Sequence, residues 1–141
     1  MTGHHEFGHH RVCINVGNTE LIRNIRKLWK DKKTYVKGWA YYWDSIYGFF
    51  AKQIEENREL KDATLIVRYD ALCKSPSKII DEILANTELS TEKFDKVKSY
   101  YVKHLHKPTY YTPNFTDQER LNIAEITNST STRLGLSTTK M

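Results

Sequence analysis

The most informative residues of this chain are three consecutive polar ones that could bind a ligand: Arg68, Tyr69 and Asp70. They follow directly on an uninterrupted apolar run from Leu65 to Val67. A run of this kind, without alternation of polar residues, is typical of a strand buried on both faces in a parallel sheet. Ligands of open parallel sheets bind beyond the carboxyl ends of the strands. The pattern therefore predicts a ligand site at these three side chains.

Each of the three side chains can supply something different. A tyrosine such as Tyr69 offers a ring face and a hydroxyl group, although it can equally be a residue at the edge of the core. For Arg68 we favour an ion pair with a neighbouring helix over a phosphate contact. We interpret Asp70 as structural, orienting the loop that leads to Ser75.

Neither the histidines nor the cysteines form a recognisable reactive group. The amino-terminal histidines lie close together but lack the carboxylate or cysteine companions of a zinc site: His4, His5, His9 and His10. Cys13 and Cys73 are far apart and form no CxxC pair, so we interpret them as reduced thiols of a cytosolic protein. We predict no metal site and no Ser/His/Asp or Cys/His catalytic arrangement.

The composition is that of a globular domain rather than a disordered chain. The 141 residues are 39% hydrophobic and 28% charged, with a net charge of +5. This charge favours anionic partners, but the lysines and arginines are scattered, so we predict no nucleic-acid partner. The apolar stretch from Gly38 to Phe50 is interrupted by Asp44 and is too short to span a membrane. A polar start at Met1 argues against a secretory signal, and we expect a cytoplasmic protein.

The apolar periodicity predicts five helices and one strand. The helices are expected over about Thr19–Lys30, with Asn18 as cap, over Val36–Asn57, after Ser75-Pro76, after Ser90, and from the capping box Thr116–Glu119 to a stop at Gly135. The aromatic stripe of the second helix we interpret as core rather than as a base-stacking platform. The strand is Leu65–Tyr69, and the alternation over residues 12–17 is compatible with another short one.

A single strand cannot be stable alone, because each unpaired buried backbone group costs about 1–3 kcal/mol. The sheet must therefore come from another chain, or from the rest of a larger α/β domain.

Several segments together resemble the PAPS-dependent sulfotransferases, and bacterial members in particular. The run from Leu65 to Pro76, followed by Ile79–Leu84, resembles their late strand and helix. Other segments agree in order with further motifs of the family: Phe7–Arg11 with Phe-Gly-x-His-Arg, Trp39–Gly48 with the Trp-containing helix, Lys107–Pro113 with Pro-x-Tyr-Tyr, and Leu134-Gly135 with the near-terminal ending. The resemblance covers roughly residues 7–136, and it is the order of the motifs that makes it specific.

The resemblance implies an α/β fold class: the carboxyl-terminal part of a P-loop-like sulfotransferase domain, mostly helical with one parallel-type strand. It also implies that a sulfuryl group passes from PAPS to an acceptor hydroxyl or amine. Tyr69 matches the family tyrosine that packs on the adenine side of this cofactor. His10 and Arg11 match a loop that would form a lid near the acceptor. No metal is implied.

Several departures from the family pattern bear on activity. The strand–loop–helix that cradles the 5′-phosphosulfate is absent, as is the Arg-x-Pro…Ser segment that holds the 3′-phosphate, and Asp70-Ala71 stands where the family has Glu-Asp. We therefore expect residues 1–141 to form a single partial domain that is inactive alone. Its parts would be a lid-like segment 1–17, a body 18–136 and a frayed tail 137–141.

The partners expected on this reading are the missing amino-terminal half or a second copy of the chain, and a hydroxylated small molecule or glycan as acceptor. The alternative is a non-enzymatic helical interaction module that self-associates through strand 65–69. A basic nucleic-acid binder ranks last, because no base-reading element is visible.

Overall fold

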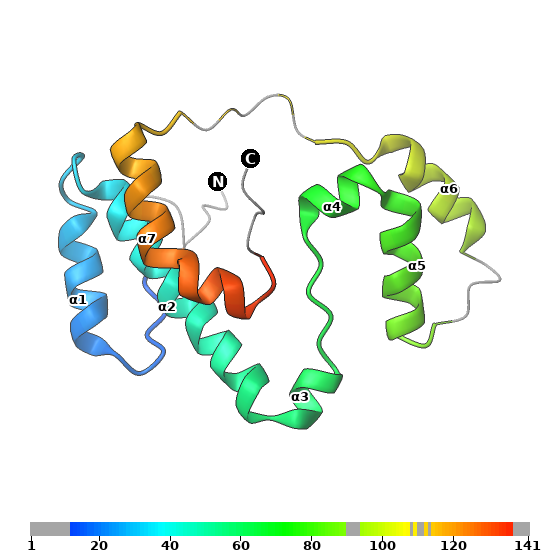
Figure 1. Ribbon diagram of the computed structural model, residues 1–141, viewed down its shortest axis with the longest axis horizontal. Coiled ribbons are helices and arrows are strands. Elements are labelled where there is room, and N and C mark those ends of the chain that lie inside the picture. The colour runs from blue at the N-terminus through cyan, green and yellow to red at the C-terminus, as the bar shows by residue number, and fades with distance from the viewer. Residues whose placement is uncertain (1–11, 90–93, 108, 110–111, 113, 137–141) are drawn as a thin grey trace. The chain divides into compact units, whose positions relative to one another are not determined.

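The computed structural model describes residues 12–89, 94–107, 109, 112 and 114–136 (Figure 1). Within these residues the chain forms seven helices and no strand. The helices are α1 (Thr19–Leu28), α2 (Tyr35–Glu56), α3 (Arg58–Asp62), α4 (Tyr69–Lys74), α5 (Pro76–Asn86), α6 (Asp95–His104) and α7 (Asp117–Arg133). The chain divides into two units, one made of Met1–Lys61 with Asn114–Met141 and the other of Asp62–Pro113.

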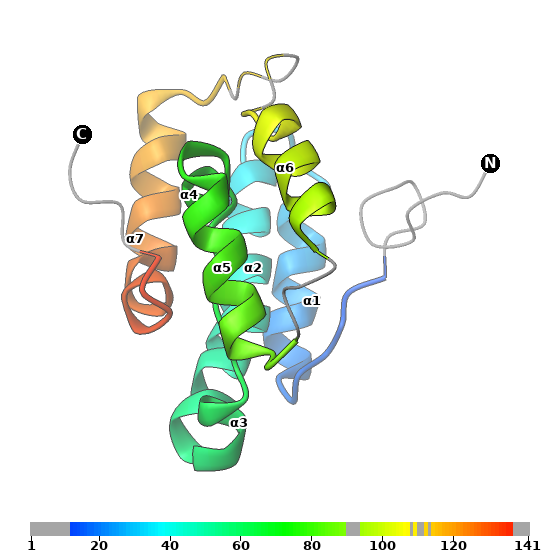
Figure 2. The ribbon, with the colours of Figure 1, turned by 90° about the vertical axis from the view of Figure 1, so that its right-hand side faces the viewer.

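The first unit is built around α2, which lies between α1 and α7 (Figure 2). The long helix is the one that the aromatic stripe predicted. Where α1 meets it, the core is an aliphatic and aromatic cluster of Ile22, Ile25, Trp29 and Tyr42. Trp29 lies with its ring centroid 4.5 Å from that of Trp39 and 5.4 Å from that of Tyr42. The stripe of α2 is therefore core at this end, as expected.

The other side of α2 meets α7 through smaller residues. Thr130 of α7 is buried, and a Cβ added at Gly48 would lie 3.2 Å from its hydroxyl oxygen. Arg133 forms two hydrogen bonds to the carboxylate of Glu55, at 2.9 and 2.7 Å. These bonds are the main reason why the pKa of Glu55 is lowered from its ordinary value. An ion pair and a close helix approach thus hold α7 on α2.

Several predicted helix ends are confirmed. The side chain of Asn18 accepts a hydrogen bond from the backbone of Leu21 at 2.9 Å and caps α1. The capping box of Thr116 and Glu119 is formed in both directions at the start of α7. Gly135 has a φ of +65°, the left-handed conformation that ends many helices.

The second unit contains α4, α5 and α6. Pro76 starts α5 at a position where its missing N–H is not needed. Ile80 and Leu84 are the buried residues of α5. Lys98 of α6 joins Asp81 of α5 through two short contacts, at 2.6 and 2.8 Å. Apolar burial is thus sparse in this unit, and an ion pair adds to the contact between the last two helices.

The predicted strand Leu65–Tyr69, and with it the α/β P-loop-like fold class, is wrong for the residues that the structure describes. Residues 64–68 form neither helix nor strand, and they run as an elongated segment into α4 (Figure 1). Tyr69 is already the first residue of that helix. A strand exists only through its ladder, and no other described segment offers one. The alternating residues from Val12 to Gly17 likewise form no strand.

Among the described residues, no helix combines the length and the apolar character needed to cross a membrane.

Candidate functional site

The predicted ligand site at the end of the apolar run lies at the start of α4. Arg68 is the N-cap residue in extended conformation, with φ −80° and ψ 127°, and Tyr69 and Asp70 begin the helix. The side chain of Tyr69 is 56% exposed. The guanidinium of Arg68 holds the carboxylate of Asp70 at both ends, with Nε–Oδ1 at 3.0 Å and Nη2–Oδ2 at 2.6 Å. Arg68 thus pairs with a residue two positions along the chain and not with a neighbouring helix.

This bidentate pair sets the charge state of Asp70. The hydrogen bond from Arg68 is the largest cause that lowers the pKa of the Asp70 carboxyl from its ordinary value. A carboxyl group whose pKa is lower in the folded than in the unfolded chain stabilises the fold above its unfolded pKa. That contribution is lost as the pH falls through the folded pKa. Asp70 therefore stays ionised at neutral pH with its carboxylate held by Arg68, and its role in orienting the loop to Ser75 stays a prediction.

We expect the substitution Arg68→Gln to raise the pKa of Asp70 toward its ordinary value, because the neutral amide removes the charged donor. A carbon-detected NMR titration of the side-chain carboxyl carbons measures this directly. Glu55 is the internal control, because its lowered pKa depends on Arg133 and must not change. An unchanged pKa of Asp70 in the variant would show that the pair is not formed in solution.

The described residues fit only part of PAPS, the cofactor that the family resemblance implies. The exposed ring of Tyr69 suits one face of a purine. A phosphosulfate needs consecutive backbone N–H groups in a glycine-rich loop. Of the four described glycines, Gly38 and Gly48 lie inside α2, while Gly17 and Gly135 are isolated left-handed residues. Arg68, the cation next to Tyr69 in the sequence, is engaged by Asp70, so no step of sulfuryl transfer is assigned to this chain.

Several of the sequence predictions fall on residues outside the described part of the chain. His10 and Arg11, the predicted lid, lie there together with the histidine cluster, and so does the predicted tail 137–141. Within the described residues, no group of three or more His, Cys, Asp or Glu side chains is placed to hold a metal ion.

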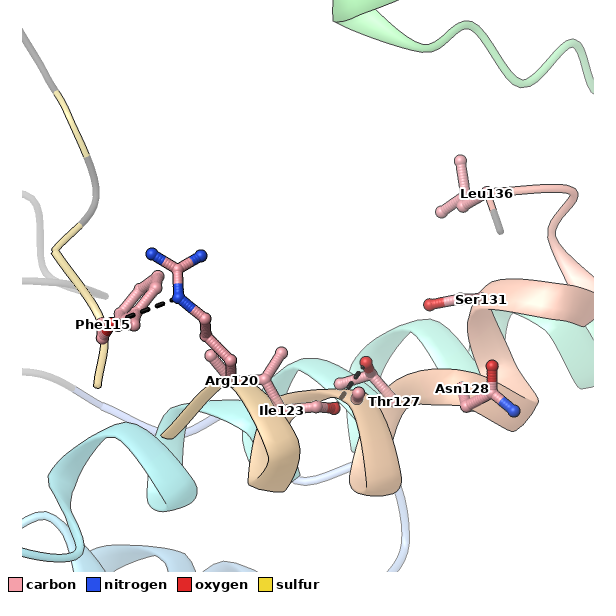
Figure 3. Close-up of a pocket in the computed structure, with 8 residues that line it drawn as sticks. Phe115, Arg120, Ile123, Thr127, Asn128, Ser131 and Leu136 are labelled. Carbon is pink, nitrogen blue, oxygen red and sulfur yellow. Dashed lines mark hydrogen bonds between the residues drawn. The ribbon is translucent and has the colours of Figure 1, made fainter. Parts of the chain in front are cut away.

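The structure also contains a groove along α7 that the sequence did not predict (Figure 3). Its volume is about 360 Å³. Phe115 and Arg120 stand at one end, Ser131 and Leu136 at the other, and the helix forms the floor. The Nε atom of Arg120 donates to the carbonyl oxygen of Phe115 at 3.2 Å, which fixes the guanidinium at its end of the groove.

Among the described residues that line this groove, Arg120 is the one charged side chain. Its lining contains no histidine and no carboxylate, so it offers no general acid or base beside the hydroxyl of Ser131. The hydroxyl of Thr127 donates to the carbonyl of Ile123 at 2.8 Å and is thereby engaged in the helix. The spacing of Arg120, Thr127 and Ser131 places them along one side of a helix, but helical spacing alone does not say which side stays open.

Comparison with known proteins adds no relative: no protein-family model matches the chain, and neither a curated protein nor a solved structure matches it significantly. The likeness to sulfotransferases therefore stands on the ordered motifs within residues 7–136.

Proposed function

We propose that this chain takes part in PAPS-dependent sulfuryl transfer to a hydroxyl or amine of a small molecule or glycan. In this proposal the chain contributes Tyr69 to the adenine side of the donor. The missing amino-terminal half contributes the loop that binds the phosphosulfate. We place the reaction in the cytoplasm, in keeping with two free cysteines, Cys13 and Cys73.

The observation that carries the proposal is the elongated apolar segment before Tyr69. Leu65, Ile66 and Val67 are 39%, 41% and 36% exposed, so apolar side chains on both sides of the segment meet water. In the part of the chain that the structure describes, the backbone groups of these three residues form no hydrogen bonds. A segment with open backbone groups and exposed apolar side chains on both sides favours burial against a partner, which in this proposal is the missing region of the enzyme.

Self-pairing of this segment is the second candidate, since the same open backbone groups favour it. Two copies would form a two-stranded ribbon over three residues each. An isolated two-stranded ribbon is at best marginally stable in water, and both of its apolar faces would remain exposed. A larger partner region can cover both faces, so we rank it above self-pairing.

The purified chain is expected to bind 3′-phosphoadenosine 5′-phosphate only weakly and to transfer no sulfate from ³⁵S-labelled PAPS to a panel of phenols and sugars. The part of this binding that NMR locates at α4 should be lost in Tyr69→Ala. Tyr101→Ala is the matched control, because Tyr101 is 48% exposed and lies on α6.

Two outcomes would overturn the proposal. Efficient sulfation by the chain alone would show that it contains its own phosphosulfate site. Equal binding by the Tyr69 and Tyr101 variants would remove Tyr69 from the adenine site. A third result would favour the alternative function. If sedimentation equilibrium shows a dimer that Ile66→Pro dissociates, and the nucleotide does not bind, the chain is a self-associating interaction module and not part of an enzyme.

A further inference from the structure

One face of α6 gathers cations, a hydroxyl group and aromatic rings around a shallow hollow of about 460 Å³. The lining residues recur at steps of three and four, which places them on the same side of a helix: Asp95, Lys96, Ser99, Tyr100, Lys103 and His104. Neither the family motifs nor the proposed function uses this face. All of its residues lie in the second unit, so the hollow stands independently of the groove on α7.

The rings of Tyr100 and His104 form a fixed platform in this hollow. Their centroids are 4.1 Å apart and their planes differ by 23°, which is a stacked arrangement. The Nδ1 atom of His104 lies 2.6 Å from the carbonyl oxygen of Tyr100, so it carries the proton that it donates there. The Nε2 atom of the neutral ring is then an acceptor, so His104 contributes its ring surface to the hollow and no hydrogen bond to an anion. Tyr100 is 57% exposed, which leaves ring surface accessible.

The lysines of α6 divide between two roles. Lys98 is engaged by Asp81 of α5, whereas Lys96 and Lys103 form no ion pair with any residue that the structure describes. These two are seven residues apart, which is about 10 Å along a helix, with the hydroxyl of Ser99 between them. Asp95 lies next to Lys96 and repels an anion at that end. An oxyanion is therefore favoured near Lys103, away from Asp95. The helix dipole disfavours anions at this carboxyl end, so the charge of Lys103 must outweigh it.

We propose that this face of α6 binds a ring-bearing sulfate or phosphate ester. Lys103 holds the oxyanion, Lys96 adds a second positive charge, and the exposed surface of Tyr100 packs against the ring. Charged hydrogen bonds of this kind are the stronger ones, and they gain selectivity when an aromatic surface fixes the body of the ligand.

The test is a titration of the full chain with 4-nitrophenyl sulfate and 4-nitrophenyl phosphate, followed by backbone amide NMR. The expected shifts centre on Ser99, Tyr100, Lys103 and His104. Lys103→Gln and Tyr100→Ala should each weaken binding by about fivefold or more. Lys61→Gln removes the same charge from α3, and Tyr47→Ala removes an exposed ring from α2, so these matched controls should bind as the parent chain does.

Comparing the dissociation constants of the two esters shows which oxyanion the site prefers. The ester with the lower dissociation constant identifies the ligand as a sulfate or a phosphate ester. The proposal is overturned if neither ester shifts these resonances. It is also overturned if Lys61→Gln weakens binding as much as Lys103→Gln, which would mean a general charge effect. Equal binding of free sulfate and the sulfate ester, unaffected by Tyr100→Ala, would contradict the role of the ring. Amide spectra that coincide outside α6 verify that each variant is folded.

Discussion

Replacing Trp29 with alanine should lower the free energy of unfolding by about 3–5 kcal/mol, the range for a large aromatic side chain removed from a core. Trp29 is 9% exposed and lies at the end of α1. Its ring contacts those of Trp39 and Tyr42, both from α2, and the neighbouring Ile25 is completely buried. The cavity left by the substitution would be bounded by two rigid rings, which limits how far the surroundings can collapse. Urea denaturation followed by circular dichroism measures the loss.

The matched control for this substitution is Trp43→Ala on the same long helix. Trp43 is only partly buried, and it stacks on Tyr47, whose side chain is 43% exposed. Water can therefore fill the space left by its removal, and we expect a clearly smaller loss than for Trp29. Equal losses for the two tryptophans would mean that the contact between α1 and α2 is not the main core of this unit.

The features that the sequence predicted correctly are those that depend on nearby residues. Asn18, the pair Thr116 and Glu119, and Gly135 act within a few positions of their own helix, so their roles can be recognised without the fold. The long helix α2 was equally predictable, because its apolar positions repeat over 22 residues. Helices α3 and α4 were missed, since five and six residues are too few to show a period.

The features that the sequence predicted wrongly depend on what lies opposite a segment. The run Leu65–Val67 has the composition of a buried strand, but a strand also needs a partner, and the described chain contains none. The same applies to α6, where the spacing of Val97 and Tyr101 places these apolar residues on one face. They are 41% and 48% exposed, because periodicity identifies a shared face but not what covers it. The groove on α7 was missed because the spacing of its residues does not show which side of the helix stays uncovered.

Substituting Gly38 with alanine should destabilise the chain by about 1–2 kcal/mol, although alanine is normally the better residue inside a helix. A Cβ atom at this position would lie 2.7 Å from Cδ1 of Trp29 and 3.0 Å from Cβ of Leu28. The first distance is too short for two carbon atoms, so one of the groups must move. Trp29 is held by the rings of Trp39 and Tyr42, and it cannot move without disturbing the core.

Two opposing effects decide the sign of the Gly38→Ala change. Alanine gains about 0.5–1 kcal/mol over glycine within a helix, whereas forcing an extra methyl group into a packed core costs about 1–3 kcal/mol. Gly48→Ala in the same helix separates these effects, because its nearest contact is the hydroxyl oxygen of Thr130 at 3.2 Å. That position needs a shift of only a few tenths of an ångström, and we expect a change near zero. If Gly38→Ala raised the midpoint of urea denaturation, α1 and α2 would have to lie farther apart in solution than the ring contacts of Trp29 require.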